Sequence, residues 1–205
     1  MATRGRPRAF DRDQALARAM EVFWTKGYEG AQLVDLTAAM GINPPSFYAA
    51  FGSKEAAFRE AVELYIATVG AVPMRAMEAA PTAREGIRAM LEGSVDVALS
   101  SRSGGCLLVL GVINCLDENQ AARELLKGTR RLTLDLIRRR LDRGVRDGDL
   151  APDADIDRLA AFFLGMTQAI SFQARDGAGR DQLMGLIPPA LTVLDAAVTA
   201  AGTPR

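Results

Sequence analysis

The sequence predicts an all-α protein of about nine helices, in which a short three-helix unit precedes a larger helical part. Apolar residues recur at three- and four-residue spacing over most of the chain, which is typical of helices packed on one face. The sequence contains no strand-like alternation and no internal repeat of solenoid length. Breakers such as Pro81, Gly104-Gly105 and Asp147-Gly148 divide the chain into separate helical periods.

The composition limits the function before any motif is considered. The 205 residues are 49% hydrophobic and 24% charged, as expected for a soluble protein with a core, and the formal net charge is zero. The absence of histidine removes Ser–His catalysis and the commonest zinc ligand, so no enzymatic activity, metal site or cofactor is expected. The longest uncharged apolar run, 104–116, has 13 residues, too few to span a bilayer, and a cytoplasmic protein is expected.

The first ten residues have the composition of a basic arm. Arg4, Arg6 and Arg8 occur there without any acidic residue. Pro7 disfavours a helical conformation at the preceding residue, which keeps the arm extended. Such an arm can follow a DNA minor groove or a line of phosphates, although a solvated tail has the same composition.

The first helix is expected to begin after Asp11, which can cap it, and to run to about Lys26. Gly27 then ends the regular helix. Trp24 continues the apolar stripe and is interpreted as a core residue rather than a ligand-stacking one. The buried face of this helix is expected to comprise Leu16, Ala19, Met20, Phe23 and Trp24.

Residues 33–54 have the spacing of a helix-turn-helix. Leu33, Leu36 and Met40 form one apolar stripe on a short helix, and Gly41 suits the left-handed position that follows its last turn. Two short helices joined by such a tight turn form a shape that can enter a major groove.

The second helix of this unit is expected to begin at Pro44, with Asn43 as its N-cap. Phe47 and Phe51 stand four residues apart and form its inner face. Ser53 can cap the helix that follows. The residues left facing outward are Ser46, Tyr48 and Ala49.

The runs RDQALARAMEVFWTKGYEG and DLTAAMGINPPSFYAAFGSKEAAF together resemble the N-terminal DNA-binding domain of the TetR/AcrR-type transcriptional regulators. The later runs GGCLLVLGVINC and SFQARDGAGRDQL also resemble one branch of that family. The resemblance implies a DNA-binding domain over residues 1–54 and a helical effector-binding and dimerisation domain over residues 55–205. The matching marks are Lys26-Gly27-Tyr28, Asp35-Leu36, Met40-Gly41-Ile42, Phe47-Tyr48, Phe51 and Ser53-Lys54-Glu55.

The resemblance also assigns roles within the helix-turn-helix. It implies that Tyr48 contacts the DNA backbone and that Lys54 meets a phosphate. Gln32 stands where relatives usually carry Ser or Thr, but its amide can still reach a phosphate oxygen. The positions that match base-facing residues of the family are Asn43, Pro44, Pro45, Ser46 and Ala49.

The sequence departs from the family at the recognition helix. Pro44 and Pro45 replace the Lys or Arg and Gly often found there, and Ala50 replaces a frequent His or Tyr. Without a cation on this helix, a bidentate contact to guanine is unavailable. Readout is therefore expected through thymine methyl groups, through Ser46 and Asn43, and through DNA shape.

The remaining chain is expected to form a long helix from Lys54 to about Pro73, followed by helices near 83–100, 105–115, 118–146, 154–175 and 180–200. The arginines of 127–146 are expected on a solvated outer surface, with a second nucleic-acid surface as the alternative. Pro188-Pro189 should kink or restart the final helix.

The last two helices are apolar on more than one side and must pack against more than one neighbour. A homodimer four-helix bundle satisfies this requirement, and the family resemblance implies the same pairing. A dimer with two-fold symmetry would bind double-stranded DNA at a near-palindromic operator.

Together with these patterns, the family resemblance implies a dimeric transcriptional regulator, interpreted as a repressor that a small-molecule effector releases from its operator. With no charged residue clearly pointing inward, the effector is expected to be uncharged and apolar. A cavity of at least ~300 Å³ among residues 83–175 would favour an effector. The candidate lining residues, each of which also fits an ordinary core, are Met90, Val97, Cys106, Val109, Phe162, Met166 and Phe172.

Two alternatives to this function remain at this point. The chain could be an orphan regulator with the same DNA contacts and a filled interior, or a helical ligand-binding protein or enzyme whose basic arm is incidental. Cys106 and Cys115 are interpreted as buried small residues, with a redox pair as the alternative.

Overall fold

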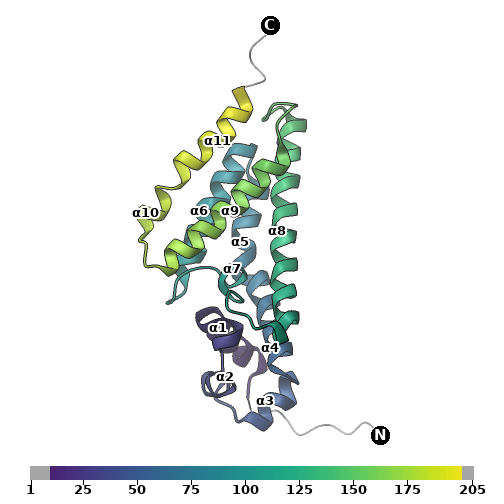
Figure 1. The fold of residues 1–205 in the computed structure, drawn as a ribbon, viewed down its shortest axis with the longest axis vertical. Helices are drawn as coiled ribbons and strands as arrows, with labels where there is room; N and C mark the ends of the chain where they lie inside the picture. Colours follow the sequence, from purple (N-terminus) through teal and green to yellow (C-terminus); the bar gives the residue numbers. More distant parts are fainter. Residues whose placement is uncertain (1–9, 200–205) are drawn as a thin grey trace, which may run out of the picture.

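The computed structural model describes residues 10–199, where nine α-helices of eight or more residues are joined by turns and two shorter helices. No strand occurs in this range, which confirms the predicted all-α class. The first three helices form one end of an elongated molecule, and the later helices form the other (Figure 1). None of the helices in residues 10–199 is both long enough and apolar enough to cross a membrane.

The first of these ends, which we call the N-terminal end, contains α1 (Arg12–Gly30), α2 (Leu33–Met40) and α3 (Pro44–Phe51). Asp11 caps α1 as predicted, because its Oδ1 accepts from the N–H groups of Asp13 at 3.0 Å and Gln14 at 3.1 Å. Gly27 interrupts the helical geometry with φ +69°, so the regular part of α1 ends where the sequence predicts. One further turn then leads to α2.

The predicted long helix after residue 54 is present and extends further than expected. It consists of α4 (Lys54–Tyr65), a π-helical turn (Ile66–Gly70) and α5 (Ala71–Ala79). Pro73 does not end it, because this residue lies in the first turn of α5, where a missing N–H costs little. The helix therefore reaches from the N-terminal end deep into the larger part.

The larger part of the molecule is built mainly from long helices. Its elements are α6 (Ala83–Ser100), α7 (Leu107–Leu110), a 3-10 turn (Asp117–Asn119), α8 (Gln120–Asp147), α9 (Ile156–Arg175), α10 (Arg180–Met184) and α11 (Ile187–Thr199). Pro188 and Pro189 lie in the first turn of α11, so the predicted restart of the final helix is confirmed.

The predicted helix over 105–115 is wrong. Only the four-residue α7 forms there, within a segment that we call the connecting segment, residues 104–119. Its polar groups bond to distant elements instead of to a helical ladder: Cys106 N donates to Ser171 Oγ at 2.6 Å, and Gly111 O accepts from Tyr28 N at 2.7 Å. The apolar periodicity of this run therefore reflects burial rather than helix length.

The expected outer position of the arginines in 127–146 is wrong for Arg140, which is only 1% exposed. Its Nε donates to Met77 O and its Nη2 to Ala80 O, both at 3.3 Å. These carbonyls belong to the C-terminal end of α5, where a cation is favoured by the helix dipole. Arg140 thus fastens α5 to α8 from inside the core.

Candidate nucleic-acid interface and ligand cavity

The turn between α2 and α3 has the geometry that the sequence predicts. Gly41 adopts φ +69° and ψ 33°, the left-handed conformation that ends α2. Asn43 Oδ1 accepts from Ser46 N at 2.9 Å, and Pro44 occupies the first position of α3. Local capping therefore fixes where α3 begins and which residues it turns outward.

Helix α3 has one buried face and one free face. Phe47 and Phe51 lie in the core, whereas Tyr48 is 52% exposed. Ser46 is half-buried beside its cap. The other predicted base-facing positions, all exposed, are Asn43, Pro44, Pro45 and Ala49. The free face thus offers small and apolar groups with one phenol, at the narrow end of the molecule.

Sequence reasoning missed Val34, which is 71% exposed on α2 beside this surface. The signal was available, because Val34 falls off the stripe of Leu33, Leu36 and Met40 and must therefore face away from the core. Its side chain enlarges the apolar part of the exposed surface of α2 and α3.

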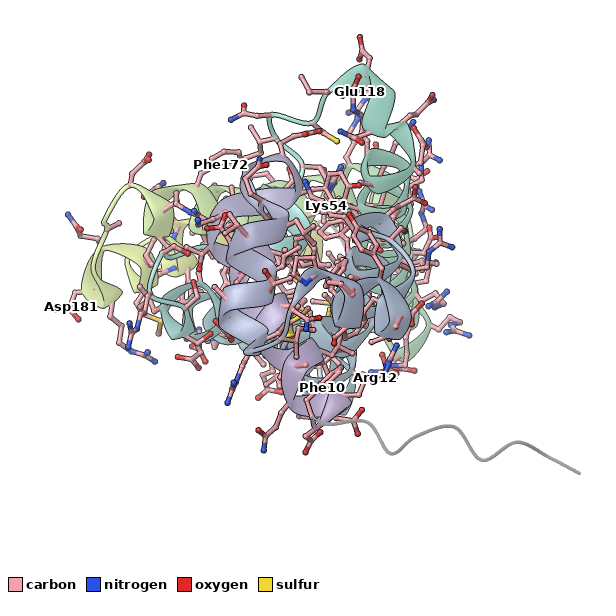
Figure 2. The ribbon with its side chains drawn as sticks, turned by 90° about the horizontal axis from the view of Figure 1, so that it is seen from below. Phe10, Arg12, Lys54, Glu118, Phe172 and Asp181 are labelled. Carbon is pink, nitrogen blue, oxygen red and sulfur yellow. The ribbon has the colours of Figure 1, made fainter. Side chains whose placement is uncertain are left out.

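Lys54 and Gln32 both have partners within the protein. The Lys54 ammonium lies 4.4 Å from the centroid of the Tyr28 ring, and burial lowers the pKa of this lysine. The Gln32 Nε2 donates to Glu29 O at 3.2 Å. In the view toward this end of the molecule, Lys54 lies near the middle and Phe10 and Arg12 lie at one edge (Figure 2). The predicted phosphate contacts of Lys54 and Gln32 stay predictions.

Arg4, Arg6 and Arg8 lie outside the described residues. Arg12, just after them, was not singled out from the sequence. Its Nη2 lies 2.7 Å from Glu60 Oε2, and its guanidinium stacks 4.7 Å above the Phe51 ring. Arg12 therefore fixes the beginning of α1 against α3 and α4.

The connecting segment joins α1 to the larger helices. Trp24 Nε1 donates to Gly105 O at 2.7 Å, and Tyr28 N donates to Gly111 O at the same distance. From the end of α9, Arg175 donates through Nη1 to Thr25 O at 3.1 Å. A displacement of this segment would therefore be transmitted to α1.

Glu29 adds a charged contact to the same junction. Its Oε1 accepts from Leu116 N at 2.8 Å and from Asn119 Nδ2 at 2.7 Å. Burial acts to raise the pKa of Glu29, but these hydrogen bonds outweigh it and lower the pKa below the ordinary value. The carboxylate form is thus favoured in the folded protein.

Replacing Glu29 by Gln is expected to reduce the acid sensitivity of folding slightly. Because the folded-state pKa is depressed, Glu29 stabilises the protein above its unfolded pKa, and this contribution is lost as the pH falls through the folded pKa. Urea unfolding from neutral pH down to the acid range should show a shallower decline for Glu29→Gln than for the parent protein. An equal decline in both proteins would contradict the assignment.

A cavity of about 70 Å³ lies between α4, α5, α6, α8, α9 and the connecting segment. Tyr65 lies at its wall, donates from its hydroxyl to Cys106 Sγ at 3.1 Å, and packs edge-on against Trp24 at 4.8 Å. Burial raises the pKa of both Tyr65 and Cys106, so both groups stay protonated. Both cysteines are free.

The structure does not bring all the predicted lining residues together. Val97, Cys106 and Val109 line this cavity. Met90 is fully buried in the core outside the lining, and Met166 is half-buried there. Phe162 is 37% and Phe172 46% exposed, which places them on the surface.

Phe172 instead borders an open groove of about 430 Å³ between α1, the connecting segment and the end of α9. The expectation that no charged residue points inward is wrong for the smaller cavity, because Arg130 forms part of its wall.

Comparison with known proteins identifies relatives of this arrangement. Residues 15–61 match the family model described as bacterial regulatory proteins, tetR family, and residues 82–178 match a tetracyclin repressor-like C-terminal domain. The HTH-type transcriptional repressor ComR of Escherichia coli (strain K12) is 30% identical over 184 residues, covering 89% of this chain and 88% of ComR. An uncharacterized HTH-type regulator, YezE of Bacillus subtilis (strain 168), is 31% identical and covers 93% of this chain and 100% of its own length.

A solved structure is more similar still. It holds a cysteine mutant of the TetR family transcriptional regulator CifR, complexed with 26-base-pair double-strand operator DNA. CifR is 46% identical, superimposes with a TM-score of 0.88, and covers 91% of this chain and 98% of its own.

Proposed function

The chain belongs to the TetR family of bacterial regulatory proteins and is a DNA-binding transcriptional regulator, and from this premise we propose how it binds and releases DNA. Members of this family are regulators rather than enzymes. Two copies bind a near-palindromic operator as a repressor, each through residues 1–54, and residues 55–205 provide the dimer contacts and the effector site. A small molecule in the cavity between the long helices releases the operator.

The free outer face of α3 is the observation that carries this proposal. It is held outward by its buried Phe47 and Phe51, at the end of the molecule opposite the one where α8 and α11 end. A helix of this size presented at a tip fits a major groove. The CifR complex with operator DNA supports the same use of the domain here.

We assign separate roles in DNA binding to the residues on this face. The exposed phenol of Tyr48 contacts the DNA backbone, and Ser46, together with Asn43 and Ala49, faces base edges. The half-buried Lys54 and the arm residues Arg4, Arg6 and Arg8 supply further phosphate contacts, and affinity should fall with salt accordingly.

Tyr48→Phe is expected to weaken binding to all duplexes by a similar factor, because it removes a contact that carries no sequence information. Ser46→Ala is expected to change the ranking of duplexes selected from a random library, by about 1–3 kcal/mol at the affected base pair. In vitro selection followed by anisotropy titration measures both effects. A uniform loss for both variants would contradict the division.

Dimerisation through α9 and α11 is supported by apolar side chains that the single chain leaves exposed. Phe162 and Phe172 on α9 and Val193 on α11 are each more than a third exposed. Pairing of these two helices with those of a second copy would cover them in a four-helix bundle.

Effector control is supported by contacts that the cavity shares with α1. Tyr65 both lines the cavity and packs against Trp24, and Trp24 donates to Gly105 O in the connecting segment. A ligand that shifts Tyr65 or this segment therefore changes the position of α1. The ligand must prefer the released arrangement by about 1–3 kcal/mol.

One observation favours a second candidate, an orphan regulator without an effector. The cavity of about 70 Å³ is well below the range of about 300–1,000 Å³ typical of ligand pockets. An effector must therefore be small or must open the cavity. Operator release by a small molecule, in an assay with purified protein, separates the two candidates.

A further inference from the structure

We propose that the cavity beside Tyr65 binds a short-chain monocarboxylate, whose carboxylate is received by the Arg130 guanidinium. The inference rests on the proposed effector-controlled function and names the chemical class of its ligand. It replaces the uncharged effector that the sequence alone predicts.

Arg130 places a positive charge at the cavity wall. Its Nη1 donates to Leu108 O at 2.7 Å, which holds the guanidinium in place, and it forms no ion pair with any carboxylate of residues 10–199. Burial lowers the pKa of Arg130, which reflects the cost of keeping a cation away from water. A ligand carboxylate would supply the missing charge through charge-assisted hydrogen bonds.

The two other arginines with desolvated guanidinium groups have a different use. Arg140 donates to the C-terminal carbonyls of α5, and Arg175 donates to Thr25 O and Trp24 O at the end of the regular part of α1. Both join one helix end to another element, and neither lines the cavity. Of these three arginines, Arg130 is thus the one at the wall of the 70 Å³ cavity.

A second polar group faces the same space. Gln168 lines the cavity from α9, and its side-chain amide makes no hydrogen bond to another described residue. It can donate to the second oxygen of a bound carboxylate. The rest of the wall is mainly apolar and includes Pro73, Met74, Val97 and Leu164. A polar head with a short apolar tail matches this distribution.

The volume limits the tail. The cavity of about 70 Å³ is roughly half the volume of an apolar cavity known to hold benzene, so a ligand must be small and the walls must move more for each carbon atom added to its tail. Propionate and butyrate therefore require the least movement of the walls, and hexanoate requires the cavity to open further.

The test is isothermal titration of the full-length protein, without DNA, with propionate, butyrate and hexanoate and with butyramide as the neutral isostere. Butyrate is expected to bind about 10- to 100-fold more tightly than butyramide, the range expected for hydrogen bonds to a charged group. Arg130→Met should remove this difference. Arg131→Met, which removes the same charge from an exposed neighbour on α8, should keep it.

Equal affinity for butyrate and butyramide, or no binding of either, would overturn the proposal. This comparison uses the parent protein, so it decides the question even if Arg130→Met fails to fold. If the protein binds its selected operator but not butyrate, the carboxylate site is refuted and the proposed DNA-binding function stands. If the protein binds butyrate but no DNA duplex, the carboxylate site is supported and the proposed DNA-binding function is refuted.

Discussion

A double replacement of Phe162 and Val193 by glutamate is expected to make the protein monomeric and to lower its operator affinity by about 100-fold or more. Both side chains are more than a third exposed, on α9 and α11, where a second copy would cover them. Burying two carboxylates on each side of an interface is costly without partners. Sedimentation velocity measures the first effect, and anisotropy titration with the selected operator measures the second.

The large effect on DNA follows from geometry rather than from any lost DNA contact. In a dimer, binding of one half-site holds the second recognition helix close to its own half-site, and this local concentration multiplies the affinity. The matched control is the double replacement of Val72 and Leu132 by glutamate, two exposed apolar residues on α5 and α8. The control should remain dimeric and bind normally. A dimeric Phe162→Glu/Val193→Glu protein would refute pairing through α9 and α11.

The DNA-binding end could be predicted in detail because the interactions that shape it are local. Asn43 caps α3 and Ser53 caps α4, each bonding to an N–H three residues further on. Gly41 takes the left-handed conformation that its place after α2 requires. Such features depend only on residues close together in the sequence, so a single sequence is enough to predict them.

The interior of the larger part was harder to predict because its polar partners are distant in sequence. Arg130 bonds to a carbonyl 22 residues away, and Arg140 to one 63 residues away. Both partners are backbone carbonyls rather than carboxylates, so the pattern of charged residues in the sequence does not predict these contacts. Helical spacing did carry a signal: Arg130 precedes Leu134 by four residues, and Arg140 follows Ile137 by three, which places both arginines next to the inner stripe.

The prediction of a helix in the connecting segment was wrong for a related reason. Its apolar periodicity predicts a helix over 105–115, but the positive φ angles of Gly104 and Gly105 turn the backbone against α9. Hydrogen bonds to α1 and α9 then replace the helical ones. Tertiary contacts of this kind override periodicity and cannot be read from the run itself.

Gly104→Ala is expected to lower the free energy of unfolding by at least about 3 kcal/mol. A Cβ at this position would lie 2.5 Å from Ala174 O and 2.8 Å from its carbonyl carbon, and the φ of +71° already disfavours an L side chain. Relief would require moving the backbone of α9 or of the connecting segment. Urea unfolding at fixed protein concentration measures the loss, because the stability of the proposed dimer would depend on concentration.

Gly128→Ala is the matched control, because nothing lies within 4 Å of a Cβ built there and α8 is regular at this point. The same added methyl group should stabilise the protein by about 0.5–1 kcal/mol through helix propensity. Opposite signs for the two substitutions would show that the packing of the connecting segment against α9, rather than glycine content, sets the stability. Equal unfolding of Gly104→Ala and the parent protein would mean that the segment is free to move away from α9, and it could then not hold α1 in place.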